Sequence, residues 1–471
     1  MARSNVATPA APVYTHGGGK AVAGLTPIQK LRRSVMSCML FEDEFYEDGQ
    51  SIAARIHEYA AQVKPEELAE LAVEVRTDGN LRHVPLLLLT ALIKTDSGRQ
   101  DGLVAATINK VVQRPDELGE LLAIYKKVNK GKRVPLAGQL KKGLAQAFTK
   151  FDEYALAKYN KNKGEVEYTL KDVLFMSHAE PKDQAQKRLW KRLINDKLKT
   201  PDTWEVELST GGDKKETFTR LIKEGKLGYF ALVRNLRNMV ESGVDNKLVR
   251  EAILARQNGA HRLLPFRFVA AAKHAPIFED VLDQAMVANL QDVPKLPGTT
   301  LVIIDVSGSM YGGTVSAKSD MDRARAACAL GAIAREVCDN PVIYATAGSD
   351  SRRTHKTALV PARRGMALVD AIYEMCHPLG GGGIFLTQCL NYCRDQLKGQ
   401  TIDRVIVITD EQDCSGALDA PSKAPILGTS GNYIINVASY DKGIGYRNGW
   451  TNISGFSEAV IKYIYAVEQT Q

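Results

Sequence analysis

The stretch Thr300-Leu-Val-Ile-Ile-Asp305-Val-Ser307-Gly-Ser309 decides how this sequence of 471 residues folds. Its first half is a continuous apolar run, typical of a parallel strand that is buried on both faces. Its second half places one carboxylate and two hydroxyls at alternate positions of the turn that follows. Because open α/β sheets bind ligands beyond the carboxyl ends of their strands, this stretch predicts a sheet with a site at its edge.

Helices and strands alternate downstream of this stretch. We expect helices at 321–338, 367–375, 387–397 and 458–468, and further strands at 342–346, 404–409 and 433–438. Such alternation predicts an α/β fold, a doubly wound parallel sheet with helices on both faces. The segment 292–298 contains two prolines and a glycine and marks the boundary, so we assign residues 298–471 to this domain.

The part upstream of the boundary is predicted to be all-α. Apolar residues recur with helical spacing, and we expect helices at 65–75, 83–94, 103–129, 139–158, 183–199, 214–223, 227–240, 246–256 and 275–290. Helical pairs that cannot bury their own apolar faces usually stack as HEAT-like repeats. No sharp repeat is present, so a compact all-helical domain is the alternative. We assign residues 26–292 to this domain and residues 1–25, which lack periodicity, to a flexible arm.

The composition is that of a folded protein, with 44% hydrophobic and 25% charged residues. No apolar run reaches the ~18 residues of a membrane span, and the N-terminus lacks a signal-peptide pattern, so we expect a cytoplasmic protein. Seven cysteines without a CxxC pair favour a reducing compartment. Cys389 and Cys393 lack a second pair of metal ligands nearby, so we interpret them as buried thiols.

Positive charge is concentrated in one region. The net charge is +8, and residues 121–163 contain eleven Lys and Arg against two acids, Asp152 and Glu153. The rest of the chain is therefore almost neutral. A basic segment of this kind favours a polyanionic partner, although a solvated helix face is the ordinary alternative for a lysine-rich helix.

Two further features are expected at the same edge of the sheet as Asp305. They are the run Gly380–Gly383, followed by Thr387, and the pair Thr409-Asp410 at the end of an apolar strand. Oxygen donors from three loops, completed by water, form an incomplete octahedron that suits a divalent cation, Mg²⁺ above all.

This pattern of DxSxS, a threonine and an aspartate resembles the metal-ion-dependent adhesion site of von Willebrand factor A domains. The resemblance implies that Asp305, Ser307, Ser309, Thr387 and Asp410 coordinate the metal, with both serines binding directly. Three residues, Ile384-Phe-Leu, separate Thr387 from the glycines, a longer spacing than the family usually has.

An enzymatic role has little support in the sequence. A serine in a strand-to-helix turn can be a nucleophile, but the GxSxG elbow is absent. Neither His355 nor His377 has a reason to act as its base, and no Walker lysine pattern is present. We therefore expect no catalysis, and a metal-dependent hydrolase remains only as an alternative that RNA turnover would reveal.

The helical part carries a second resemblance. The segments 138–159 and 170–178, with Leu31-Arg32-Arg33 and 232–236, resemble the TROVE domain of Ro autoantigen proteins and their bacterial orthologues, from about residue 25 to the end. The resemblance implies a helical ring closed by the adhesion-type domain. It also implies that small structured Y RNAs bind a basic outer surface, and that single-stranded ends of misfolded RNA enter a central hole.

The resemblance points to particular RNA contacts. Lys158 and His178 match the family pattern, and Lys161 and Lys163 lie nearby. Lys141, Lys142 and Lys150 recur at helical spacing and would extend a positive stripe along the phosphate backbone. Arg234 and Arg237 either line the hole or pair with acids. We expect the neighbouring aromatics Phe148, Phe151 and Tyr159 to be core residues.

Together these observations predict a non-catalytic RNA-binding protein whose partner is noncoding, Y-like RNA and, in addition, misfolded RNA. An exoribonuclease or an RNA-repair enzyme is a candidate protein partner, and neither a membrane nor DNA is expected. The alternative is a protein-interaction adaptor whose metal site captures a carboxylate of its partner.

Overall fold

The computed structural model describes residues 26–469 except 37, 39, 41–46, 96–101, 130–133, 264, 291–294, 315–320, 415–423, 439, 441–442, 445–448 and 456–458. The described chain has two parts, helices up to Ala288 and a six-stranded sheet with its helices from Leu296 onward. The expected N-terminal arm, 1–25, lies outside the described residues. Among those residues, no helix combines the length and apolar character that a membrane crossing requires.

The first part is built from short helices that stack in sequence order. They are α1 Pro27–Met36, α2 Gly49–Ala60, α3 Pro65–Thr77, α4 Val84–Leu92, α6 Leu103–Val111, α7 Pro115–Val128, α8 Gly138–Phe148, α9 Glu153–Tyr159, α10 Leu170–Ser177, α11 Gln184–Ile194, α12 Trp204–Ser209, α13 Lys214–Lys223, α14 Tyr229–Arg234, α15 Leu236–Glu241, α16 Asn246–Ala255, α17 Pro265–His274 and α18 Glu279–Ala288. Neighbours pack in layers, as α3 does on α4 and α6. The prediction of stacked helical repeats is confirmed.

The close approach of α8 to α6 shows how tightly these layers pack. Gly143 in α8 faces Ile108 in α6, and a Cβ atom on the glycine would lie 2.7 Å from the Ile108 Cδ1 atom. No side chain fits at that distance, so the two helices depend on glycine there. Leu140, Leu144, Ala147 and Phe148 of α8 are fully buried.

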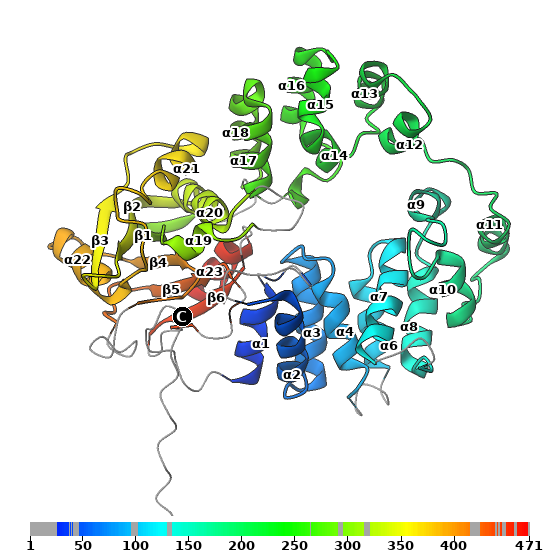
Figure 1. Ribbon diagram of the computed structural model, residues 1–471, viewed down its shortest axis with the longest axis horizontal. Coiled ribbons are helices and arrows are strands. Elements are labelled where there is room, and N and C mark those ends of the chain that lie inside the picture. Colours follow the sequence, from blue (N-terminus) through cyan, green and yellow to red (C-terminus); the bar gives the residue numbers. More distant parts are fainter. Residues whose placement is uncertain are drawn as a thin grey trace, which may run out of the picture.

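The helices follow a ring whose two ends meet at the α/β part (Figure 1). At the first end, α1 packs on the last strand of the sheet, and Arg33 forms an ion pair of 2.8 Å with Glu411. At the second end, α17 and α18 pack on helices of the α/β part, and the Asp283 carboxylate accepts a hydrogen bond of 3.1 Å from the Met366 N–H. The α/β part therefore closes the ring.

The sheet has the strand order β3-β2-β1-β4-β5-β6. Its strands are β1 Leu296–Asp305, β2 Cys338–Ser349, β3 Thr354–Leu359, β4 Arg404–Thr409, β5 Gly431–Asn436 and β6 Thr451–Ser454. Its helices are α19 Gly308–Tyr311, α20 Arg323–Val337, α21 Gly365–Tyr373, α22 Leu386–Gln396 and α23 Ala459–Gln469. All neighbouring strands pair in parallel except β2 and β3.

Alternate residues of β1 face different layers of the core. Val302 and Ile304 belong to the apolar cluster that includes α20 and α21, whereas Leu301 and Ile303 belong to the cluster that includes α22. Helices therefore cover both faces of the sheet, as the apolar run predicted. The α/β prediction is confirmed.

The structure differs from the expectation in three respects. First, neither edge strand was expected: β3 pairs antiparallel in a sheet expected to be parallel, and β6 forms the other edge. Second, β1 begins at Leu296, so part of the expected boundary segment 292–298 lies in the strand. Third, the expected helices at 103–129, 139–158 and 227–240 are each two helices. Pro115 starts α7, which explains the first break, because proline has no N–H for the preceding helix.

Candidate functional site

The residues expected to bind metal come from three segments that meet at one edge of the sheet. Asp305 is the last residue of β1, Ser307 is the N-cap of α19, Ser309 is in α19, and Thr387 is in the first turn of α22. Asp410 follows β4, which pairs with β1 in parallel up to Ile304 and Ile408. All five side chains are buried, with at most 8% exposed. The fold thus gathers donors that are more than a hundred residues apart.

Hydrogen bonds hold the two carboxylates in place. The Asp305 carboxylate accepts from the Ser307 N–H at 2.8 Å and from the Thr409 hydroxyl at 2.7 Å. The Asp410 carboxylate accepts from the Gln412 N–H at 3.1 Å. The Ser307 and Ser309 hydroxyl oxygens lie 3.3 Å apart. These bonds use only part of the acceptor capacity of the two carboxylates.

Two buried oxygens of this cluster lack a partner. Neither the Thr387 Oγ1 atom nor the Asp410 Oδ2 atom has a hydrogen bond within the described chain. Burial raises the pKa of both Asp305 and Asp410, and the charge of Asp305 raises that of Asp410 further. Unpaired buried oxygens and two close carboxylates are costly unless a cation compensates them, so the donors fit a divalent ion. The described chain has no cluster of three or more His, Cys, Asp or Glu suited to a metal, so this is a hydroxyl-rich site.

Several expected RNA contacts lie on α8 and at the end of α9, two helices that both pack on α7. Lys141 and Lys142 are in α8, Lys158 is in the last turn of α9, and Lys161 follows it. None of the four forms an ion pair with a described residue. The Lys158 ammonium lies 5.9 Å from the ring centres of both Tyr154 and Tyr159. These lysines present charge that no acid of the described chain neutralises.

Other lysines of the basic segment have structural partners. The Lys150 ammonium donates to the carbonyls of Asn109 and Val112 at the end of α6, and burial lowers its pKa. Lys163 pairs with Asp172 at 3.0 Å. Lys126 is buried and donates to the Val134 carbonyl. The charge counted along the sequence therefore overstates the charge offered to a ligand.

The remaining candidates are exposed. His178 ends α10 with a left-handed backbone (φ 52°) and forms the C-cap of that helix. Arg234 is exposed, and no described residue pairs with it, whereas Arg237 lies 3.7 Å from Glu241. Phe148 and Phe151 are buried, which confirms the interpretation of these two aromatics as core residues, whereas Tyr159 is only partly buried and lies beneath the Arg114 guanidinium.

Helix α11 adds cations that sequence reasoning missed. Its Trp190 packs edge-to-face on Phe148 of α8 with ring centres 5.3 Å apart, and its Arg192 pairs with Glu153 of α9 at 2.8 Å. Lys187, Arg188 and Lys191 are exposed on the same helix. We call the following seven residues the basic surface: Lys141, Lys142, Lys158, Lys161, Lys187, Arg188 and Lys191. The absence of acids from 184–194 was the signal that could have revealed this extension.

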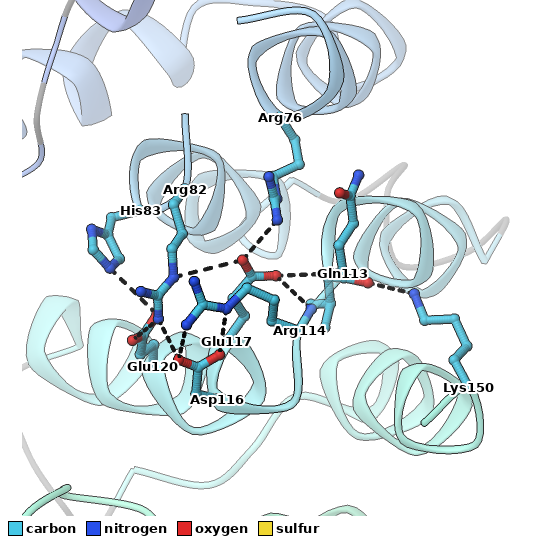
Figure 2. Close-up of polar contacts among 10 residues, drawn as sticks. Arg76, Arg82, His83, Gln113, Arg114, Asp116, Glu117, Glu120 and Lys150 are labelled. Carbon is cyan, nitrogen blue, oxygen red and sulfur yellow. Dashed lines mark hydrogen bonds and ion pairs between the residues drawn. The ribbon is translucent and has the colours of Figure 1, made fainter. Parts of the chain in front are cut away.

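A partly buried ion-pair network joins α3, the segment before α4, and α7 (Figure 2). Glu117 of α7 is fully buried and accepts from Arg76 at 2.9 Å. Arg114 bonds Asp116 through two nitrogens, at 3.1 and 2.8 Å, and its guanidinium carbon lies 4.5 Å from the ring centre of Tyr159. The network thus connects the interior of the repeats to the end of α9, where Lys158 and Lys161 lie.

Known proteins are similar to this chain in sequence. A family model described as the TROVE domain matches residues 28–195 and 174–374. Telomerase protein component 1 of Rattus norvegicus is 24% identical over 303 residues, covering 46% of this chain and 11% of that protein. The protein of the same name from Mus musculus is 39% identical over 79 residues, covering 16% and 3%. The chain thus spans about a tenth or less of the length of these relatives.

A solved structure shares the architecture. The crystal structure of the Deinococcus radiodurans Ro (RSR) protein matches 95% of this chain and 100% of that one, with a TM-score of 0.56 and 16% sequence identity. At this identity the likeness shows a common fold, a helical part followed by an α/β part.

Proposed function

This chain belongs to the TROVE domain family, and from that membership we propose that it is a non-catalytic protein that binds RNA. The observation that carries the proposal is the basic surface, whose seven cations lie on three adjoining segments without acidic partners in the described chain. Like charges gathered in this way repel one another unless a polyanion neutralises them. RNA supplies one phosphate per nucleotide and meets that need.

The kind of RNA follows from the kind of contact. Lysines act as point charges on phosphates and carry little base specificity, so shape and backbone should dominate recognition. We propose that a small, structured, Y-like RNA occupies the basic surface on the outside of the ring. We also propose that Arg234 helps to admit a single-stranded end of misfolded RNA into the central hole.

Replacing Lys141, Lys142, Lys158 and Lys161 together by alanine is expected to weaken RNA binding mainly at low salt. Each lost phosphate contact removes about 0.7 to 0.9 from the slope of log K against log salt, so the slope should fall by roughly 3. Fluorescence anisotropy with a structured noncoding RNA, measured over a series of salt concentrations, gives both slopes.

A matched variant controls for net charge. Lys214, Lys215, Lys247 and Lys398 are exposed and lie away from the basic surface, and their replacement by alanine removes the same charge. We expect this control to bind RNA like the wild type. Equal salt slopes for the two variants would disprove the assignment of the surface, and absence of RNA binding by the wild-type protein would favour the adaptor.

We further propose that the cluster around Asp305 holds Mg²⁺. The donors would be Asp305, Ser307, Ser309, Thr387 and Asp410, and the two unpartnered oxygens support this assignment. When bound, the ion would neutralise the paired carboxylates and offer an open position to an anionic ligand. That open position is also what the adaptor alternative would use for a partner carboxylate.

The variant Thr387→Val tests the metal with little disturbance of the fold. The Thr387 hydroxyl has no hydrogen bond in the described chain, so its loss should leave stability in EDTA within about 1 kcal/mol of the wild type. With Mg²⁺ at a hundred times its Kd, the wild type should gain about 2.7 kcal/mol, and the variant should gain much less. Thermal unfolding with and without Mg²⁺ measures both, and equal gains would remove Thr387 from the site.

A further inference from the structure

A glycine loop borders the cluster of Asp305, Ser307, Ser309, Thr387 and Asp410, here called the metal-site cluster, on its solvent side. Gly380 and Gly381 have left-handed backbones, with φ of 100° and 63°. The carbonyl of Gly382 accepts from the N–H of Gly308, between the two serines, at 3.3 Å. The N–H groups of Gly381 and Gly382 form no hydrogen bond with any described residue. Two neighbouring free N–H groups of this kind are a common anion-binding arrangement.

Lys356 of the β2–β3 hairpin lies at the same loop, and two arginines lie in the turn of that hairpin. The side chain of Lys356 lies over Gly380, and a Cβ atom on that glycine would lie only 3.3 Å from the Lys356 Nζ atom. Arg353 donates to the Cys414 carbonyl at 2.8 Å, which attaches the hairpin to the segment after β4. Arg352 beside it is exposed and has no ion pair within the described chain.

We propose that Gly381, Gly382, Lys356 and Arg352 form a phosphate subsite beside the metal-site cluster, and that its ligand is the terminal phosphate monoester of an RNA strand. A carboxylate has two oxygens, whereas these donors offer two N–H groups, an ammonium and a guanidinium, which suits the three terminal oxygens of a monoester. The choice of RNA as the carrier rests on the proposed function. The subsite itself rests on the loop and its cations.

Nearby acids make this subsite depend on the metal. The Asp350 carboxylate accepts from the Gly383 N–H at 2.9 Å, and Asp305, Asp410 and Asp413 are buried beneath the loop. With Arg323, whose charge acts on Asp410, the nearby cations only equal the four carboxylates in number, so a dianion gains little attraction from the metal-free protein. A divalent ion in the cluster makes the local charge balance positive. Phosphate binding is therefore expected only with Mg²⁺ present.

The subsite and the basic surface lie at opposite ends of the molecule, because β3 and α22 are far from α8 and α11 (Figure 1). A short single-stranded RNA therefore cannot reach both. With Mg²⁺, we expect such an oligonucleotide to bind at least about tenfold more tightly with a terminal phosphate than with hydroxyl ends. Separate 5′-phosphate and 3′-phosphate oligonucleotides identify which end is held.

Matched variants assign this preference to the subsite. Lys356→Met keeps the length of the side chain and removes its charge, so it should abolish the preference for phosphate. Lys398→Met, on the exposed segment after α22, should retain it. Equal binding of phosphorylated and unphosphorylated oligonucleotides by the wild type, or an unchanged preference in Lys356→Met, would overturn the proposal.

Inorganic phosphate separates this proposal from the proposed function. Isothermal titration calorimetry with phosphate and Mg²⁺ should show binding to the wild type and much weaker binding to Lys356→Met. If phosphate binds in this way while no RNA binds, the subsite stands and RNA as its carrier is wrong. If RNA binds the basic surface while phosphate does not bind, the proposed function stands and the subsite is wrong. If an acidic peptide binds in place of phosphate, the face serves a protein partner.

Discussion

Replacing Glu117 by alanine is expected to destabilise the helical part by about 3 to 5 kcal/mol, because it removes the one fully buried acid of an ion-pair network. Its Oε1 atom accepts from Arg76 at 2.9 Å and lies 3.7 Å from the Arg82 Nε atom. Its Oε2 atom accepts from the N–H groups of Gln113 and Arg114, at 2.8 and 3.1 Å, and so caps the start of α7. Alanine leaves all four donors without this carboxylate (Figure 2).

The Arg76 side chain accounts for most of the stability that Glu117→Ala is expected to lose. It is only 11% exposed, and burial lowers the pKa of its guanidinium while the charge of Glu117 raises it. Without Glu117, the folded state retains a mostly buried cation that has lost its hydrogen-bonded carboxylate. The free energy of unfolding, from urea titrations followed by circular dichroism, measures this effect. The helical signal reports mainly on the first part of the chain.

Glu120 provides a control within the same network. It also pairs with Arg82 but is 33% exposed, so water can replace its contacts. Glu120→Ala is therefore expected to cost no more than about 1 kcal/mol. Similar losses of unfolding free energy in the two variants would show that the burial of Glu117 does not increase its contribution to stability.

The metal-site cluster could be predicted from the sequence because its pattern is local. The apolar run before Asp305 fixes a buried strand, and the alternate spacing of Ser307 and Ser309 fixes their place in the turn that follows. Asp410 follows from the rule that parallel strands end at one edge of a sheet, whereas Thr387, which lies in α22, was assigned through the resemblance to the adhesion site. The longer spacing before Thr387 is absorbed because Phe385 and Leu386 are buried where α22 begins.

The basic surface could be predicted only in part, because charge along a sequence does not reveal partners. Lys150 bonds carbonyls at the end of α6, some forty residues away in the chain, and no local pattern predicts that contact. The cations of α11 were missed because their position beside α8 cannot be read from the sequence. They join the surface through the packing of Trp190 on Phe148, which depends on how the repeats stack.

The edge strand β3 was missed because its pattern is weak. Its sequence, Thr354-His-Lys-Thr-Ala-Leu359, mixes polar and small residues, and its last residue is 59% exposed. An edge strand is covered on one side only and has little need of the apolar run that marks a central strand. Its antiparallel pairing follows from the short turn after Ser349, since a parallel neighbour would need a long crossover.

Replacing Arg33 by alanine is expected to open the ring at its first closure. Arg33 of α1 pairs with Glu411 at 2.8 Å, and the two side chains are 5% and 1% exposed. Glu411 follows Asp410 and has a left-handed backbone (φ 61°), so its position is fixed by its surroundings. Loss of the arginine leaves the carboxylate buried without that partner, at a cost of about 3 to 5 kcal/mol. Because the pair joins the two parts, releasing α1 from the sheet is the simplest way to rehydrate Glu411.

Hydrogen exchange locates this effect and distinguishes it from general unfolding. Amide protection should fall in α1 and β6, which pack together, and should persist in α20 and β4. Arg32→Ala is the matched control, because this neighbour pairs with Glu74 while 37% exposed and should cost about 1 kcal/mol or less. The double variant Arg33→Leu, Glu411→Leu should recover part of the stability, since it removes both buried charges. If exchange in Arg33→Ala rose equally throughout the chain, the ion pair would support the fold as a whole and would not serve as the closure of the ring.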